Sequence, residues 1–293
     1  MLLVAGGELD FNLGALLRRM LRRRVKFAQA LLGAERIPRL TIDLDKDRLR
    51  LDGKSIRPTA CFMRHDVFLA QTLRTAEANA AALNWYIAIK GWELAHDEVR
   101  GFNKTVSTAD TNKLSNLFLA ARHGLKVPRT LLTNEFAAAR RALRGPLIEK
   151  PAAGGELTGH FDALTAKLAA GTAVGRYPRF VQPRLLRPEL RVFRVGDELI
   201  GFSLRSPDLD YRAALRSRLK PARVPKALGD KFYAFCSAVG LDFAAADFMR
   251  DPRGGEHRFL EVNSQPMFAA FDAVCGGRLC DAIIDALVPR RRG

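Results

Sequence analysis

Two apolar stretches near the C-terminus carry oxygen donors at strand spacing, and this pattern limits what the chain can fold into. The stretches, 244–249 and 257–262, are strand-like and are joined by a turn sequence that contains proline and two glycines. Glu261 and Asn263 are two residues apart, so a strand places both side chains on one face. Pairing of the two strands brings Asp247 to the same face. Because an unpaired acid is costly to bury among apolar residues, the pattern predicts a ligand site on a β-sheet.

The chemistry of these three side chains suits a magnesium ion, which prefers oxygen ligands and commonly bridges nucleotide phosphates. For any single acid the alternative is an ordinary surface charge. Upstream, Lys150 ends another apolar stretch, just before a turn that contains Gly154 and Gly155. The N–H groups of such a turn can approach a phosphate closely. The Walker A pattern is absent, so the sequence disfavours a P-loop nucleotidase.

The first hundred residues alternate between strand-like and helix-like segments, which is typical of an α/β domain whose strand ends line a crevice. A β-rich half follows, so we predict a mixed α/β fold. In the first half the expected elements are strands at 2–4, 40–44, 48–52 and 60–64, helices over about 13–32 and 70–83, and a separate apolar segment at 85–89. In the second half they are helices over 108–124, 134–143 and 226–239, and strands at 127–132, 146–150, 180–182, 190–195 and 198–203, before the two strands described above.

The chain carries a formal net charge of +17, and part of this charge is concentrated in one early helix. Six arginines and lysines lie between Arg18 and Lys26, and Arg290 to Arg292 come at the other end of the sequence. A basic helix can bind nucleic acid, an acidic partner or a membrane surface. The alternative, which we favour, is a solvated helix face in an arginine-rich protein. Nucleic acid is therefore not an expected partner.

No apolar run approaches the length of about 18 residues that a membrane span needs, so no membrane association is expected. The first residues predict a β-strand and not a signal peptide, because no basic segment precedes their short apolar run. The four cysteines show neither paired spacing nor neighbouring histidines, which favours reduced, packed thiols over zinc ligands or disulfides. We therefore expect a cytoplasmic protein.

A series of short motifs follows in a fixed order from about Asp110 to Ile284, roughly three-fifths of the chain. In order, the motifs are Asn112-Lys113, residues 124–130, Glu149-Lys150-Pro151 with its glycine turn, residues 181–185, Glu189-Leu-Arg191, Val195-Gly-Asp197, Arg205, Asp210-Tyr-Arg212, Gly240-Leu-Asp242, Asp247 and Glu261-Val-Asn263. This series resembles the ATP-grasp superfamily. Within that superfamily it looks closest to graspetide (microviridin-type) peptide ligases and to RimK-type ligases.

The resemblance implies a pre-ATP-grasp α/β domain over residues 1–105, followed by the two-lobed ATP-grasp fold. The first lobe, 106–187, would hold the phosphate turn and the adenine hinge, and the second, 188–293, the metal site. ATP and Mg²⁺ are the implied cofactors. The resemblance implies ATP phosphate contacts for Lys113, Lys150, Gly154 and Gly155, adenine contacts for Gln182, Arg184 and Leu185, and ribose contacts for Glu189. It implies stabilisation of the transferring phosphoryl group by Arg191 and Arg205, and makes Arg212 a candidate for binding the acyl phosphate or the acceptor. The implied Mg²⁺ ligands are Asp247, Glu261 and Asn263.

The implied reaction has two steps. A carboxylate substrate takes the γ-phosphate of ATP to give an acyl phosphate, and an amine or a hydroxyl then displaces the phosphate. The leading hypothesis is a maturase that crosslinks a ribosomal peptide, with an acidic precursor recognised through Arg64, His65 and the basic helix. The alternatives are a ligase that joins small metabolites or free amino acids, and a non-catalytic module that binds through its basic face. Whether the product is an amide or an ester, and whether the chain forms a homodimer, stays open.

Overall fold

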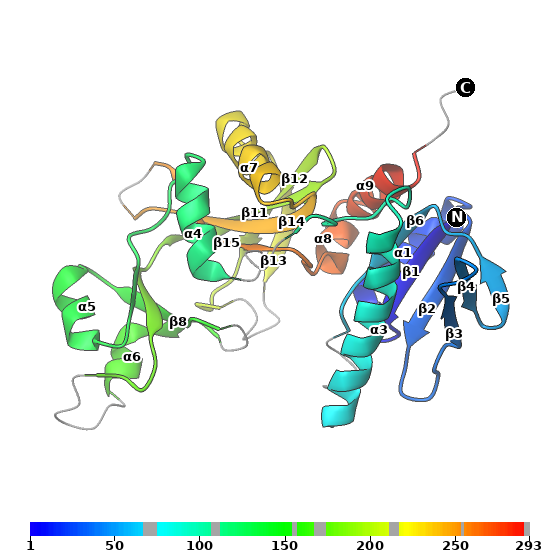
Figure 1. Ribbon diagram of the computed structural model, residues 1–293. Helices are drawn as coiled ribbons and strands as arrows, with labels where there is room; N and C mark the ends of the chain where they lie inside the picture. The colour runs from blue at the N-terminus through cyan, green and yellow to red at the C-terminus, as the bar shows by residue number, and fades with distance from the viewer. Residues whose placement is uncertain are drawn as a thin grey trace. The chain divides into compact units, whose positions relative to one another are not determined.

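The computed structural model describes residues 1–66, 75–106, 112–153, 157–166, 174–210, 217–252 and 255–289. The chain divides into two compact units, whose elements are labelled in Figure 1. Unit 1 contains Met1–Lys104 and Met267–Gly293, and unit 2 contains Thr105–Pro266. The end of the sequence therefore folds with its beginning, although the intervening unit separates them along the chain.

Unit 1 is built on a parallel sheet with the strand order β2–β1–β6. Leu3 and Ala5 of the central strand lie in a core that also contains Ile89 and Trp92 of α3. Because side chains alternate along a strand, Leu2 and Val4 point to the other face of the sheet, and they are buried as well. Burial on both faces is typical of parallel sheets. The elements are β1 (Leu2–Gly7), β2 (Phe27–Leu32), β6 (Ala60–Met63) and α3 (Ala76–Ala95).

The described part of unit 1 also contains a small antiparallel sheet, β3–β4–β5, and the helices α1, α8 and α9. Leu49 and Leu51 of the small sheet pack into the same core as α3. Helix α1 begins at a side-chain cap, because Asp10 accepts a hydrogen bond of 2.8 Å from the backbone N–H of Asn12. The bounds are β3 (Leu40–Asp43), β4 (Arg48–Leu51), β5 (Lys54–Ile56), α1 (Phe11–Arg22), α8 (Ala269–Val274) and α9 (Arg278–Leu287).

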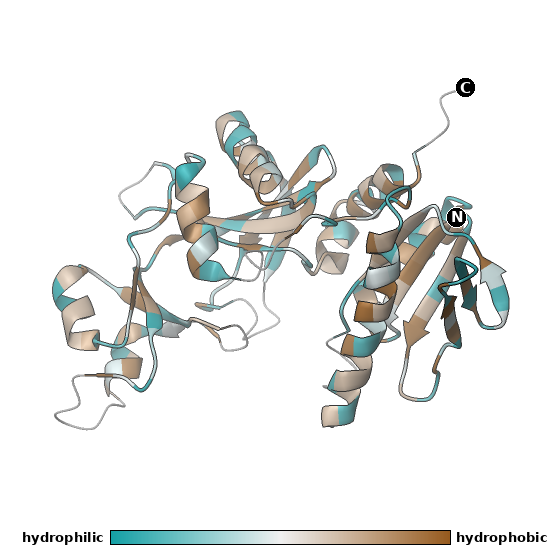
Figure 2. Cartoon of the chain, in the orientation of Figure 1, coloured by the Kyte–Doolittle hydropathy of each residue, from teal (hydrophilic) through white to brown (hydrophobic). Residues whose placement is uncertain are grey.

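Two predicted helices of this unit were wrong in extent. The helix expected over 13–32 ends at Arg22, and residues 27–32 form β2 because they pair in register with β1. Arg24 adopts a positive φ of 55°, which reverses the chain between the two elements. The apolar segment at 85–89 continues α3. This helix carries few charges, and most of its ribbon is tan or brown in Figure 2. Among the described residues, no helix combines the length and hydropathy needed to cross a membrane.

Unit 2 contains two antiparallel sheets, with the orders β7–β10–β8–β9 and β13–β12–β11–β14–β15. Helices α5 and α6 accompany the first sheet, and Phe136 and Phe161 of these helices pack with its strands. The bounds are β7 (Leu131–Thr133), α5 (Phe136–Ala142), β8 (Leu147–Pro151), β9 (Gly159–His160), α6 (Phe161–Ala166), β10 (Arg179–Pro183), β11 (Leu186–Val195), β12 (Glu198–Arg205), β13 (Arg218–Ala222), β14 (Phe243–Arg250) and β15 (His257–Asn263).

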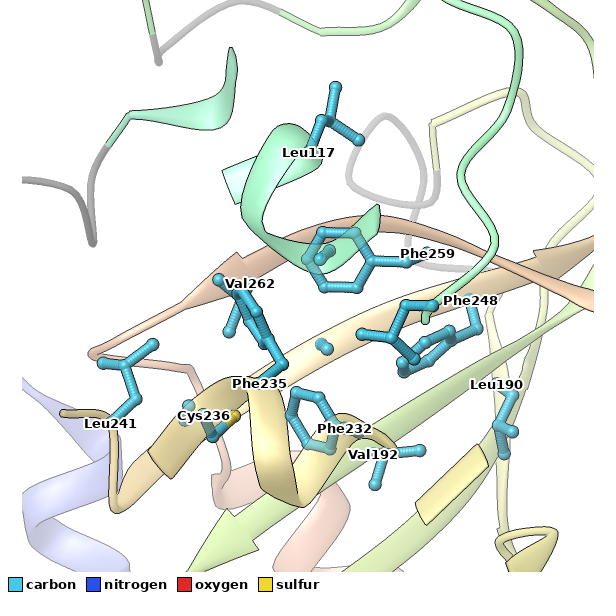
Figure 3. Close-up of a cluster of buried hydrophobic side chains, with 14 of the residues drawn as sticks. Leu117, Leu190, Val192, Phe232, Phe235, Cys236, Leu241, Phe248, Phe259 and Val262 are labelled. Atoms are coloured by element: carbon cyan, nitrogen blue, oxygen red, sulfur yellow. The ribbon is translucent and has the colours of Figure 1, made fainter. Parts of the chain in front are cut away.

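The main core of unit 2 lies on one face of the five-stranded sheet, under α4 (Lys113–Arg122) and α7 (Lys226–Ala238). Figure 3 shows Phe235 of α7 together with Phe248 and Phe259 of the sheet in this core, and the ring of Phe259 contacts the rings of both others. These aromatic rings are fully buried and pack edge to face. Because this face of the sheet is apolar, polar residues at the alternating positions must point to the other face.

Candidate active site

Three charged side chains form a row across the middle of the five-stranded sheet. Arg191 of β11 is the direct cross-strand partner of Asp247 on β14, which in turn is the partner of Glu261 on β15. Side chains at such positions lie within contact range on the same face. Nε of Arg191 is 3.2 Å from Oδ1 of Asp247, and both side chains are buried. The predicted pairing of Asp247 with Glu261 is therefore present.

A β-bulge next to this row decides which way Glu261 points. Asp247 pairs with Glu261, but the next residue, Phe248, pairs with Phe259, so Leu260 is an extra residue on β15. In a regular strand Phe259 and Glu261 would share a face, because they are two residues apart. The bulge lets Phe259 enter the apolar core while Glu261 joins the charged row on the opposite face. The N–H of Phe259 donates to the carbonyl of Lys126 at 2.8 Å.

Two lysines from different elements act on Glu261. Lys113 is the first residue of α4, and its Nζ lies 3.3 Å from Oε2 of Glu261. Asn112 caps this helix by accepting a 3.0 Å hydrogen bond from the N–H of Ser115. The cap fixes the start of α4 and with it the position of Lys113. Lys150 comes from β8 in the other sheet. Burial opposes ionisation of Glu261, but the charges of Lys150 and Lys113 outweigh it and hold the pKa of Glu261 below its usual range.

The remaining acids of the cluster are pushed toward their neutral form. Burial raises the pKa of Asp247 well above its usual range, and the nearby charges of Glu189 and Glu261 raise it further against the opposing effect of Arg191. Burial also raises the pKa of Glu189, although Arg191, Arg187 and Lys150 oppose this. A cation bound among these carboxylates would remove the penalty, because it favours their ionised forms.

The donors present fit a magnesium ion. Oδ1 of Asp247 is buried, and its 3.2 Å contact with Nε of Arg191 is an ion pair without hydrogen-bond geometry, so this oxygen retains a lone pair for a metal. Asn263 lies two residues beyond Glu261 on the same face of β15, opposite Ala245. Within the described part of the chain, no group of three His, Cys, Asp or Glu side chains forms a metal site by itself. The candidate set consists instead of two facing carboxylates and one amide oxygen, which is oxygen chemistry of the kind that Mg²⁺ prefers.

The segment predicted to hold adenine begins in β10, which pairs with β8, the strand that carries Lys150. Gln182 is buried, and its Nε2 donates to Oγ1 of Thr130 at 2.8 Å, while its Oε1 has no hydrogen-bond partner among the described residues. The N–H of Arg184 already donates to the carbonyl of Pro146 at 2.8 Å, so it is not free to bind a base. The Arg184 side chain is exposed, whereas Leu185 is buried. The predicted adenine contacts of Arg184 and Leu185 stay predictions.

Comparisons with known proteins agree with this geometry. No family model matches the chain. In sequence the chain is similar to the alpha-aminoadipate–LysW ligase LysX of Sulfurisphaera tokodaii, with 27% identity over 185 residues. These residues are 56% of this chain and 65% of LysX, so the chain spans less than two-thirds of that relative.

Solved structures match over nearly the whole length. The ATP-grasp ligase PsnB, complexed with a minimal precursor, is 25% identical with a TM-score of 0.72, over 97% of this chain and 98% of PsnB. A RiPP-associated ATP-grasp ligase of Chryseobacterium gregarium, in complex with ADP and a leader and core peptide, is 18% identical with a TM-score of 0.73, over 100% of this chain and 98% of its own. The chain has the ATP-grasp fold. The predicted α/β fold class and the resemblance to the ATP-grasp superfamily are confirmed.

The ATP-grasp fold brings together most, but not all, of the predicted residues. Arg205 is exposed at the end of β12, and alternation from Phe202, the partner of Arg191, places it on the opposite face of the sheet. Gly154, Gly155 and Arg212 lie outside the described residues.

Arg187 lies beside Glu189, the predicted ribose ligand, and was not among the residues predicted from the sequence. Its Nη1 is 3.7 Å from Oε2 of Glu189, and its Nη2 donates to the carbonyl of Leu209 at 2.9 Å. The signal available in the sequence was an arginine two residues before Glu189 at the start of the same strand. Among so many arginines this signal is weak.

Some of the residues predicted to recognise a peptide in unit 1 form ion pairs within that unit. Arg64 is buried, and its Nε lies 2.6 Å from Oδ2 of Asp10, so it is not a surface cation. In the basic helix, Arg19 pairs with Asp281, and Arg23 pairs with Asp281 and Asp285 of α9. These ion pairs dock α1 on α9, which is a structural use of two of the helix's arginines.

Proposed function

We propose that this chain is an ATP-dependent carboxylate ligase that uses Mg²⁺ and crosslinks a peptide through an acyl phosphate. The observation that carries the proposal is the convergence of Lys113 and Lys150, from two separate elements, on Glu261 next to its cross-strand partner Asp247. Paired carboxylates beside converging cations are suited to a metal-bound polyphosphate, because each sign of charge has a partner there.

Each residue of the cluster has a part in this proposal. Lys113 and Lys150 bind phosphate oxygens and keep them close to the sheet. Arg191 is held by its ion pair with Asp247 and presents a planar, multiply donating group to the transferring phosphoryl. Asp247, Glu261 and Asn263 would hold Mg²⁺, which offsets phosphate charge when bound. Positioning and electrostatics supply most of the acceleration, since phosphoryl transfer requires little covalent work from the protein.

A peptide is the substrate class that the similar structures support. PsnB was solved with a minimal precursor, Mg and ADP, and the C. gregarium ligase with a leader and core peptide. We assign peptide recognition to residues 1–105, phosphate and adenine binding to 106–187 and the metal site to 188–293. The strongly basic net charge favours an acidic precursor.

A second candidate function has its own observation. The sequence similarity to LysX concerns a ligase named for alpha-aminoadipate, which is a free amino acid. A ligase that joins a free amino acid to its acceptor would use the same ATP and Mg²⁺ site, so only the acceptor and the carboxylate would differ.

The test traps the acyl phosphate. The protein is incubated with Mg·ATP, hydroxylamine and either free acidic amino acids or synthetic peptides that combine Asp or Glu with Ser, Thr or Lys. We expect ADP release and hydroxamate with the peptides, and loss of water from the peptides when hydroxylamine is omitted. Lys150→Met should abolish both signals, whereas the exposed Lys226→Met should not. Hydroxamate from free amino acids alone would establish the second candidate, and failure of the wild type to bind Mg·ATP would refute both.

A further inference from the structure

Two buried polar atoms without partners lie on neighbouring residues at the edge of the candidate nucleotide site. They are Nη1 of Arg187 and Oε1 of Glu189, and neither has a hydrogen-bond partner among the described residues. Buried donors and acceptors are almost always hydrogen-bonded in native proteins, so two such atoms on adjacent side chains call for an explanation.

An ordinary structural ion pair does not account for the geometry. Nη1 of Arg187 is 3.7 Å from Oε2 of Glu189, which is too long for a hydrogen bond. Both side chains are largely buried, with 19% and 8% of their surfaces exposed. A pair that served stability alone would close to hydrogen-bonding distance, because burial makes each unmade bond costly.

The guanidinium group of Arg187 is held in this position through its second terminal nitrogen. Its Nη2 donates to the carbonyl of Leu209 at 2.9 Å. The next residue, Asp210, accepts a hydrogen bond of 3.1 Å from the N–H of Thr158, which follows the predicted phosphate turn in the sequence. The segment that positions Arg187 is thus also hydrogen-bonded to Thr158, beyond the predicted phosphate turn.

The chemistry of these two atoms indicates which group can satisfy both of them. One is a donor on a cation and the other is an acceptor on a carboxylate. A hydroxyl group is the natural complement, since its oxygen accepts and its hydrogen donates. A ribose presents two adjacent hydroxyls, so its diol can satisfy Nη1 of Arg187 and Oε1 of Glu189 together.

We propose that Arg187 is a second ribose-binding residue, which donates from Nη1 to a ribose hydroxyl of ATP while Glu189 accepts from the diol. This inference rests on the proposed function, because it needs a nucleotide in the site. The predicted ribose contact of Glu189 thereby gains a cationic donor, Nη1 of Arg187, which no sequence motif indicated. The anchor on Leu209 keeps the guanidinium in place before the nucleotide arrives.

The experiment compares the binding of ATP, 2′-deoxy-ATP and 3′-deoxy-ATP by calorimetry in the presence of Mg²⁺. The variants are Arg187→Met, Arg187→Lys, Glu189→Gln and the double variant Arg187→Met/Glu189→Gln. Arg218→Met is the matched control, because Arg218 is an exposed arginine on β13 of the same sheet. Melting temperatures are measured for all of them.

We expect the wild type to prefer ATP over at least one deoxy analogue by roughly tenfold, as one charge-assisted hydrogen bond allows. Arg187→Met should lose most of this preference, because its affinity should fall more for ATP than for that deoxy analogue. Arg187→Lys should recover part of the preference, because lysine keeps one charged donor. The double variant should lose no more than the worse single variant, since both residues act on the same diol.

Two results would overturn the inference while leaving the proposed function intact. One is an unchanged preference for ATP in Arg187→Met. The other is an equal loss of affinity for all three nucleotides in both Met and Lys variants, which is the signature of a purely structural role. If the wild type binds no nucleotide at all, the proposed function itself fails, and that outcome is visible before any variant is compared. If Arg187→Met does not fold, Arg187→Lys carries the comparison, because it retains the charge beside Glu189.

Discussion

Asp247 and Glu261 face each other as direct cross-strand partners on β14 and β15, and the extra residue Leu260 makes this possible. Two carboxylates opposite each other repel, so the arrangement is unfavourable unless positive charge is supplied. Arg191 supplies it beside Asp247, Lys113 supplies it beside Glu261, and the charge of Lys150 acts on both carboxylates. The site is therefore organised for anionic phosphates and a divalent cation together.

Replacing Glu261 by glutamine should weaken Mg²⁺-dependent nucleotide binding. The change keeps the size of the side chain but removes the charge that Lys113 contacts at 3.3 Å. We expect the affinity for ADP in the presence of Mg²⁺ to fall by at least about tenfold, as for other lost metal-site partners. Calorimetry with and without Mg²⁺ measures this. Glu256→Gln, an exposed acid between the same strands, is the control, and equal affinities in the two variants would exclude Glu261 from the site.

The bulge predicts an uneven response at two consecutive positions of β15. Phe259 is fully buried in the main core of unit 2, so Phe259→Ala should lower the free energy of unfolding by about 3–5 kcal/mol. Leu260 is the half-buried extra residue, and Leu260→Ala should cost about 1 kcal/mol. Urea unfolding of the two variants measures both values. Equal losses would mean that Leu260 is also a core residue and that the register differs.

Asn12→Ala should destabilise unit 1. The Oδ1 of Asn12 accepts from the backbone N–H groups of Phe268 and Ala269 at 2.7 and 2.8 Å, and the side chain is buried. Removing it leaves these donors without their acceptor, at a cost of roughly 2–3 kcal/mol.

Thermal unfolding of the full chain measures the loss in Asn12→Ala. Asn84→Ala is the matched control, because the Asn84 side chain is exposed on α3 and donates to the carbonyl of Ala80 in its own helix. A melting temperature of Asn12→Ala as high as that of Asn84→Ala would show that the segment after residue 266 is held by other contacts.

His96 should give the stability of unit 1 a defined pH dependence. The hydrogen bond from its Nδ1 to the carbonyl of Trp92, and then the contact of Nε2 with Asp47, raise the pKa of His96 above its ordinary value. The folded state therefore binds the proton more tightly than the unfolded chain does. Its stabilising contribution is complete below about pH 6.5 and is lost as the pH rises through the raised pKa.

The measurement for His96 is the urea midpoint at about pH 5.5 and about pH 8. The wild type should lose more stability between these two conditions than His96→Gln does, since glutamine cannot titrate. His123→Gln is the control, because it removes a histidine from unit 2, at the C-terminus of α4, and leaves His96 in place. If His96→Gln keeps the full pH slope of the wild type, another group is responsible for it.

Much of the candidate site could be predicted because it depends on local spacing. Glu261 and Asn263 share a face since a strand alternates, and Lys150 ends a strand before a small-residue turn. The misread elements show where local pattern fails. Residues 27–32 carry apolar side chains that suit either a helix or a strand, and parallel pairing with β1 decided for the strand. Residues 85–89 read as a separate segment, but burial of Ile89 and Trp92 against the parallel sheet favours one continuous helix.

By itself, the sequence determined that Asp247, Glu261 and Asn263 are oxygen donors set into apolar strands. That much follows from residue type and the two-residue period of a strand. Only the tertiary structure decided that Glu261 points away from the core and that Lys113 contacts it within reach of the charge of Lys150. It also decided that Arg187 lies beside Glu189. The physical reason is that strand register, a one-residue bulge and the approach of distant elements depend on pairing between segments far apart in the chain, which no local pattern encodes.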